Sequence, residues 1–209
     1  GLLAGVNAAR RVLGKEEIVL ERSNSYIGTL IDDLVNKGTN EPYRIMTSRS
    51  EYRLLLRQDN ADARLTPKGR EAGLISDERW NAFLEKQQLI QQEMDRLEAA
   101  HLGTGQKFQE FFDERGTARP QNGTTLANLL RRPELTYEDI AIFDKKRPEL
   151  PQNVKNEVEI RVKYSGYIKN QQEQVDAFKK NQQIKLPEDL DYINISGLSK
   201  EGATKLDKI

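Results

Sequence analysis

Five arginines between residues 44 and 64 are the most distinctive chemical feature of the sequence. They are Arg44, Arg49, Arg53, Arg57 and Arg64. The guanidinium group is planar and donates paired hydrogen bonds, so it suits the phosphate groups of a nucleic acid. The same side chains could instead pair with nearby acids as structural salt bridges, which is common for surface arginines. The residues alone therefore leave a phosphate-binding and a structural interpretation open.

The spacing of three of these arginines predicts one face of a helix. Ser48, followed three residues later by Glu51, has the pattern of a capping box, so we expect a helix that begins here and runs through Arg57. Residues four apart on a helix differ by about 40° in azimuth, so Arg49, Arg53 and Arg57 would form a stripe about 80° wide. The apolar residues between them would dock this helix on a core.

Asp32 and Asp33 are the candidate catalytic residues. Two carboxylates can act as acid and base when their surroundings separate their pKa values. Adjacent residues of a helix face about 100° apart, however, so we do not expect these two to share one site. A capping or solvated acidic turn is the alternative interpretation. His101 is the single histidine and cysteine is absent, so no metal site is predicted.

Two tyrosines late in the chain, Tyr164 and Tyr167, could stack on the bases of a nucleic acid. They suit a half-buried helix face equally well. The glycines form no phosphate loop and no dinucleotide-binding fingerprint. We therefore predict no cofactor-binding residue in this chain.

Composition narrows the classes of protein. Charged residues make up 32% of the 209 residues and the formal net charge is zero, so the chain as a whole is no general polyanion binder. No segment approaches the ~20 apolar residues of a membrane span, and the lack of cysteine fits a reducing cytoplasm. The chain opens without methionine and both ends read as helix, so we expect it to be a piece of a longer protein.

The hydrophobic spacing predicts a mostly α-helical fold. A short strand followed by a helix is expected over 18–35, and a turn or short helix over 65–69. The glycine-containing stretch 103–123 reads as an exposed, linker-like connection. Longer or better-capped helices are expected at 1–13, 76–102, 125–132, 136–143, 153–181 and from 199 onward.

Four segments closely resemble the MnmG (GidA) family. They are EPYRIMTSRSEYRLLLRQDNADARLT at 41–66, YIGTLIDDL at 26–34, LLRRPE at 129–134 and VEIRVKYSGYI at 158–168. The opening GLLAGVNAA is similar to the final helix of that family's flavin domain. The resemblance implies an FAD-dependent enzyme that uses a folate one-carbon unit and works with the GTPase MnmE. Enzymes of this family install a carboxymethylaminomethyl group on the wobble uridine of tRNA.

The resemblance also implies a division of labour within this chain. Residues 1–68 would be the end of the flavin domain together with an arginine-rich segment of the tRNA cleft, and residues 69–209 a helical C-terminal domain truncated at its end. FAD would bind largely outside the chain, so we do not expect the chain alone to be active. The parent protein would be a cytoplasmic homodimer. The alternative is a module that docks the GTPase without contacting RNA.

Overall fold

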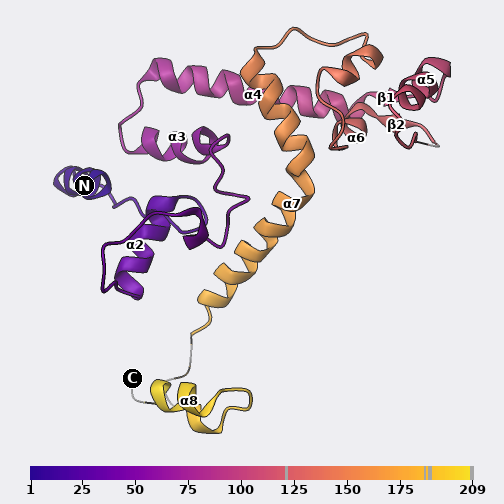
Figure 1. Ribbon diagram of the computed structural model, residues 1–209. Coiled ribbons are helices and arrows are strands. Elements are labelled where there is room, and N and C mark those ends of the chain that lie inside the picture. Colours follow the sequence, from indigo (N-terminus) through magenta and orange to yellow (C-terminus); the bar gives the residue numbers. More distant parts are fainter. Residues whose placement is uncertain (121, 186, 188–189, 208–209) are drawn as a thin grey trace. The chain divides into compact units, whose positions relative to one another are not determined.

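The computed structural model describes residues 1–120, 122–185, 187 and 190–207, and this part of the chain is mostly helical, as predicted (Figure 1). A two-stranded antiparallel ladder pairs His101 with Thr125 and Leu102 with Thr124. The α-helices are α1 (Leu2–Val12), α2 (Tyr26–Asn36), α3 (Ala61–Glu71), α4 (Asp77–Ala99), α5 (Gln106–Glu114), α6 (Leu126–Leu130), α7 (Gln152–Gln182) and α8 (Lys200–Leu206). The remaining elements are the 3-10 helices η1 (Thr47–Arg49), η2 (Asp139–Phe143) and η3 (Tyr192–Asn194) and the strands β1 (His101–Leu102) and β2 (Thr124–Thr125).

The chain divides into two compact units, Gly1–Gln172 and Glu173–Ile209. The first unit contains α1 to α6 and most of α7. The second contains the last turns of α7 together with η3 and α8. The boundary that we predict between residues 68 and 69 separates a flavin-domain remnant from a helical domain, and it stays a prediction.

Short hydroxyl side chains begin several of the helices. An oxygen at the N-cap satisfies one of the backbone N–H groups that a helix start leaves unpaired. The N–H of Gly28 donates to Ser25 at 2.9 Å, and the N–H of Asn128 donates to Thr125 at 3.1 Å. Ser76 and Ser199 cap α4 and α8 in the same way. These contacts confirm the helix starts predicted at 76, 125 and 199.

The strand expected near residue 18 does not form in the described part of the chain. The backbone N–H of Ile18 donates to Asn7 Oδ1 at 2.9 Å, and Asn7 Nδ2 donates to the carbonyl of Ile18 at 3.0 Å. The side-chain amide of Asn7 thus binds the backbone N–H and C=O of Ile18, which a neighbouring strand would have bound in a sheet. The apolar run 18–20 therefore has no regular secondary structure and is bound to α1 at Ile18.

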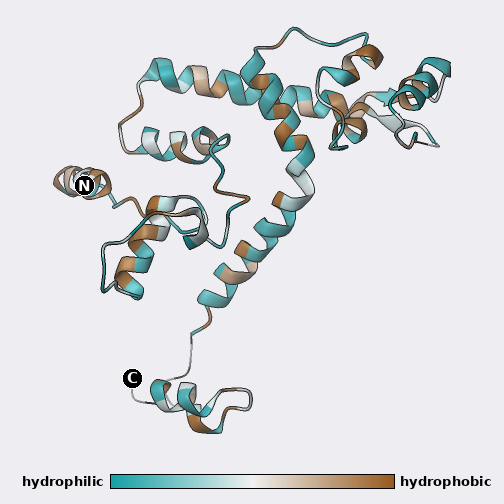
Figure 2. Ribbon diagram, in the orientation of Figure 1, coloured by the Kyte–Doolittle hydropathy of each residue, from teal (hydrophilic) through white to brown (hydrophobic). Residues whose placement is uncertain are grey.

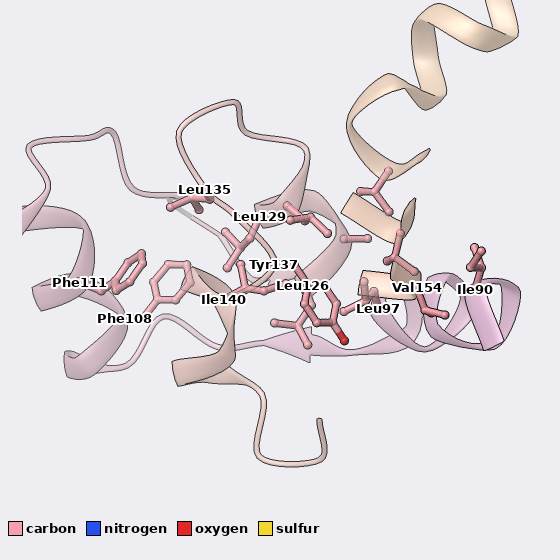
Figure 3. Close-up of a cluster of buried hydrophobic side chains, with 14 of the residues drawn as sticks. Ile90, Leu97, Phe108, Phe111, Leu126, Leu129, Leu135, Tyr137, Ile140 and Val154 are labelled. Atoms are coloured by element: carbon pink, nitrogen blue, oxygen red, sulfur yellow. The ribbon is translucent and has the colours of Figure 1, made fainter. Parts of the chain in front are cut away.

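The hydrophobic core of the first unit lies among α4, α5, α6, η2 and α7 (Figure 3). Ile90 and Leu97 of α4 lie beside Val154 of α7, and all three are almost fully buried. The ribbons of α4 and α7 are otherwise largely hydrophilic (Figure 2), so each of these helices buries a narrow face.

The prediction of an exposed connection over 103–123 is wrong for residues 106–114, whereas residues 103–105 and 115–116 are exposed and lie outside any helix, as expected. Residues 106–114 form α5, and Phe108, Phe111 and Phe112 are buried in the core. The rings of Phe111 and Phe112 meet edge to face at 5.3 Å, a favourable aromatic geometry. Residue 121 lies outside the described residues.

Gly166 offers a test of helix propensity. It lies within α7 and is exposed, and a Cβ built on it meets nothing within 4 Å. Because alanine is favoured over glycine in a helix interior by about 1 kcal/mol, Gly166→Ala should raise the free energy of unfolding by about 0.5–1 kcal/mol. Urea denaturation followed by circular dichroism measures this.

Gly69 of α3 provides the control for Gly166. A Cβ on Gly69 would approach Ile75 Cγ1 at 3.1 Å, so Gly69→Ala should gain less or lose stability. A destabilised Gly166→Ala variant would contradict the prediction.

No helix in the described residues is both long and apolar enough to cross a membrane.

Candidate nucleic-acid interface

The arginine-rich segment does not form the predicted helix. The 3-10 helix η1 spans only Thr47–Arg49, and residues 51–59 are a series of turns and bends. Ser48 lies within η1, whose N-cap is Met46 without a side-chain capping bond, and the carboxylate of Glu51 binds Arg22. The backbone of Ser50 is extended and ends the turn. Arg49, Arg53 and Arg57 therefore do not form a stripe on one helix.

Three of the five arginines are exposed. Arg44, Arg49 and Arg53 all lie on the segment between α2 and α3. The guanidinium of Arg49 lies over the ring of Tyr43, 5.2 Å from its centroid. None of the three forms an ion pair with the described residues, so their charges are available to a ligand.

The other two arginines are bound within the fold. Arg57 pairs with Asp59 at 2.8 Å, and its side chain is only 14% exposed. Arg64 donates to the carbonyls of Asn24 and Arg57 and to the side chain of Asn60. Burial, and then the positive charge of Arg57, lowers the pKa of Arg64. The contacts of Arg57 and Arg64 therefore fit the interpretation in which these arginines stabilise the fold.

Arg22 is the central residue of the site, and the sequence pattern did not single it out. Its Nη1 donates to Asp33 at 2.6 Å and to Asp32 at 2.9 Å, while its Nη2 donates to Glu51 at 2.7 Å. A further hydrogen bond runs to the carbonyl of Arg49 at 3.3 Å. Burial alone would lower the pKa of Arg22, but the hydrogen bonds to the three carboxylates raise it. Arg22 therefore fixes the arginine-rich segment against α2.

The expectation that Asp32 and Asp33 cannot share a site is wrong. The long side chain of Arg22 spans the arc between them and binds both carboxylates through one nitrogen. Gly28 makes this approach possible, because a Cβ there would lie 2.3 Å from the carbonyl oxygen of Glu21. Only glycine lets the backbone around Arg22 pack this closely on α2.

Asp33 is an anchor that is charged at neutral pH rather than a proton carrier. Its side chain is 6% exposed. The hydroxyl of Tyr43 donates to it at 2.6 Å and Lys37 Nζ donates at 2.9 Å. These bonds, and then those of Arg22, outweigh burial and hold the pKa of Asp33 far below its usual range. A carboxylate of such low basicity is a poor general base near neutral pH. The described residues also contain no cluster of three possible metal ligands.

The long helix α7 contacts this segment directly. The backbone N–H of Leu55 donates to Gln171 Oε1 at 3.0 Å, and Gln171 Nε2 donates to the carbonyl of Glu51 at 3.4 Å. The guanidinium of Arg57 lies 5.5 Å from the ring centroid of Tyr164. The turn that carries Arg53 is therefore bound to Arg22 through Glu51 and to α7 through Gln171.

An open hollow of about 400 Å³ lies next to the segment. Tyr26 and Ile27 of α2, Leu56 and the two bound arginines are among the residues that line it. The hollow does not fit a flavin by itself, because no glycine-rich turn lines it and both guanidinium groups already bind the chain itself.

Comparison with known proteins identifies the family. Residues 77–172 match the model described as the tRNA modifying enzyme MnmG/GidA C-terminal helical domain. A relative from Caldicellulosiruptor saccharolyticus, named tRNA uridine 5-carboxymethylaminomethyl modification enzyme MnmG, is 54% identical over the whole chain. The chain belongs to the MnmG/GidA family. It corresponds to the C-terminal region and covers 33% of the length of that relative.

Other members of the MnmG/GidA family agree with this assignment. The enzyme of the same name from Lachnoclostridium phytofermentans is 55% identical over 209 residues, and the chain again spans 33% of it. The solved structure of Aquifex aeolicus GidA is 40% identical, with a TM-score of 0.72. That match covers 98% of this chain and 32% of the GidA chain. The match extends over the arginine-rich segment as well as the helical domain.

Proposed function

We propose that this chain is the tRNA- and partner-binding region of an FAD-dependent enzyme that installs the carboxymethylaminomethyl group on the wobble uridine of tRNA together with the GTPase MnmE. The observation that carries the proposal is the set of three exposed arginines, Arg44, Arg49 and Arg53, on a braced segment. The printed name of the relatives supports the tRNA uridine as the substrate of the whole protein.

In this proposal the parts of the protein have separate tasks. Residues 1–68 end the flavin domain and border the tRNA cleft, and residues 69–209 form the helical domain. The rest of the protein holds FAD, which supplies the redox chemistry. The whole enzyme acts as a homodimer in the cytoplasm. Arg57 and Arg64, which the sequence predicted to bind tRNA, support the backbone of the segment through hydrogen bonds to the carbonyls of Leu54 and Arg57.

A gel-shift titration of the chain with tRNA at rising salt tests the role of the arginines. Replacing Arg44, Arg49 and Arg53 with glutamine should weaken binding at low salt roughly tenfold or more. Because each lost phosphate contact lowers the salt slope by about one, the slope should fall by roughly two to three. Guanidinium groups that are not neutralised within the fold can release counterions from the nucleic acid, which is the physical reason for both effects.

The matched control removes the same number of positive charges at positions outside the arginine-rich segment. Arg11 of α1, Arg79 of α4 and Arg119 after α5 are also exposed, and Arg119 has only a distant acidic partner, Asp113 at 3.8 Å. Because all three lie outside the arginine-rich segment, glutamine at these positions should leave affinity and slope nearly unchanged. Two results would refute the role in tRNA binding: no measurable affinity of the wild type at low salt, or equal effects of the two triple variants.

The alternative function is a module that docks the GTPase without contacting RNA. Most residues of α7 from 169 to 182 are exposed, and the charged residues among them are of both signs. Such a surface suits a protein interface. A pull-down with MnmE separates the two proposals. Capture of the GTPase by wild type and arginine variant alike, with no tRNA binding by either, favours docking.

A further inference from the structure

The exposed aromatic side chains of this protein all lie on α7. Every aromatic residue of the chain is described, and those in the exposed class are Tyr164, Tyr167 and Phe178. Tyr164 is 40% exposed and Tyr167 is 64% exposed. By contrast, the aromatic rings of α5 are packed in the core. Two exposed rings on adjacent turns of a helix leave aromatic surface available to a ligand.

The two tyrosines form a pair. Their ring centroids are 6.4 Å apart and the ring planes are inclined by 56°. Residues three apart lie on the same side of a helix, so both rings project from one face of α7. The guanidinium of Arg57 lies over Tyr164 at 5.5 Å and restrains that ring by a cation–π contact.

The same face of α7 holds the arginine-rich segment. Gln171 lies one turn beyond Tyr167 and binds the backbone of Glu51 and Leu55. The exposed Arg53 lies between those two residues in the chain. The fold therefore joins the turn that carries Arg53 to the helix that carries the two tyrosines, although these segments are more than a hundred residues apart in the chain.

We propose that Tyr164 and Tyr167 form a stacking site for unpaired bases of an RNA whose phosphates are bound by Arg44, Arg49 and Arg53. The proposal rests on the function proposed above, because the arginines must bring the RNA to α7. Unpaired bases stack on aromatic side chains, whereas the bases of a duplex are stacked on one another. Arg53 is exposed and has no acidic partner among the described residues, and it lies on the turn that Gln171 of α7 binds, which favours RNA over a protein partner as the occupant.

The test compares two RNA probes: a hairpin with an unpaired loop and a blunt duplex of equal length. Replacing both tyrosines with leucine keeps helix propensity but removes the rings. Stacking contributes about 1–3 kcal/mol per base, so hairpin affinity should fall roughly tenfold. Duplex affinity and the salt slope should remain as in the wild type, since no charge is removed. A 2-aminopurine in the loop should lose the fluorescence change that accompanies binding.

Conservative and control variants complete the experiment. Phenylalanine at both positions should restore hairpin binding, and Phe178→Leu, which removes the other exposed ring of α7, should leave it unchanged. Tyr167→Leu alone should still weaken hairpin binding. The cation–π contact of Arg57 is with Tyr164, so a loss in this variant cannot result from a disturbed Arg57. Unfolding curves confirm that each variant is folded.

The outcomes distinguish the stacking site from the proposed function. If the arginine triple variant weakens both probes while the leucine variants bind the hairpin normally, tRNA binding stands and the stacking site is refuted. Equal losses for hairpin and duplex in the leucine variants also refute it. Normal hairpin binding with loss of MnmE capture assigns the two rings to a protein interface. No binding of either probe by the wild type overturns both proposals.

Discussion

Replacing Arg22 with methionine should destabilise α2 and the arginine-rich segment by about 3 kcal/mol. The substitution removes the shared partner of Asp32, Asp33 and Glu51, and Asp33 is buried. Loss of one member of a buried ion pair costs about 3–5 kcal/mol, and the remaining bonds from Tyr43 and Lys37 reduce that cost here. Hydrogen exchange of residues 21–51, followed by mass spectrometry, should show protection reduced roughly a hundredfold.

Lys37 supplies the matched control for Arg22, because it binds the same carboxylate from the surface. Its side chain is 65% exposed, so Lys37→Met should cost less than about 1 kcal/mol. Similar losses for the two methionine variants would contradict the central role of Arg22.

The contribution of Asp33 should also depend on pH in a defined direction. Its pKa is lower in the fold than the value of about 4 expected in the unfolded chain. The ionised form is thus favoured by folding, and the stability that it contributes is complete above about pH 5 and falls as the pH drops below about 4. The difference between wild type and Asp33→Asn should shrink over that acidic range.

Glu93→Ala should lower the stability of the helical core by about 3–5 kcal/mol. Glu93 is 2% exposed and accepts hydrogen bonds from Tyr137 Oη at 2.6 Å and Arg96 Nη2 at 2.7 Å. Its removal leaves the buried Tyr137 hydroxyl without this acceptor and opens a cavity. Arg96 keeps Asp144, which limits the loss. Urea unfolding followed by the fluorescence of Trp80, the single tryptophan and a residue of α4, measures the effect.

Glu98 is the control on the same helix. It pairs with Arg131, and both side chains are more than a third exposed, so Glu98→Ala should cost less than about 1 kcal/mol. Equal effects of the Glu93 and Glu98 substitutions would show that the buried network is energetically unimportant. Burial and the hydrogen bond to Glu93 raise the pKa of Tyr137 to about 12. The part of the free energy of unfolding that the bond between Tyr137 and Glu93 contributes should therefore decline as the pH rises from about 10 through 12.

Local signals in the sequence predicted the long helices because those signals act within one or two turns. The serine caps of α4 and α8 and the valine spacing of α7 required no knowledge of distant residues. The spacing of Phe108, Phe111 and Phe112 is also helical, but the flanking glycines favoured a connection instead. In this stretch the apolar periodicity of the phenylalanines determines the structure, and the helix-breaking glycines only mark the ends of the helix.

The site could not be predicted in the same way, because its contacts join distant parts of the chain. Ser48 and Glu51 fit a capping box locally, but Arg22, 29 residues before Glu51, binds that carboxylate in the fold. Tertiary contacts of this kind override a local capping preference. The five arginines were recognised from their composition. Which of them are exposed depends on Asp59 and on backbone carbonyls that only the fold brings into reach.

The two hydrogen bonds of Gln171 make the arginine-rich segment and α7 thermodynamically dependent on each other. A ligand that holds the turn at Glu51–Leu55 in place also restricts the rotamer of Gln171, and a partner that displaces α7 must break the bonds to that turn. Binding at either element is consequently linked to binding at the other with a reciprocal coupling free energy. A single glutamine side chain is thus the link through which occupancy of one surface would alter the affinity of the other.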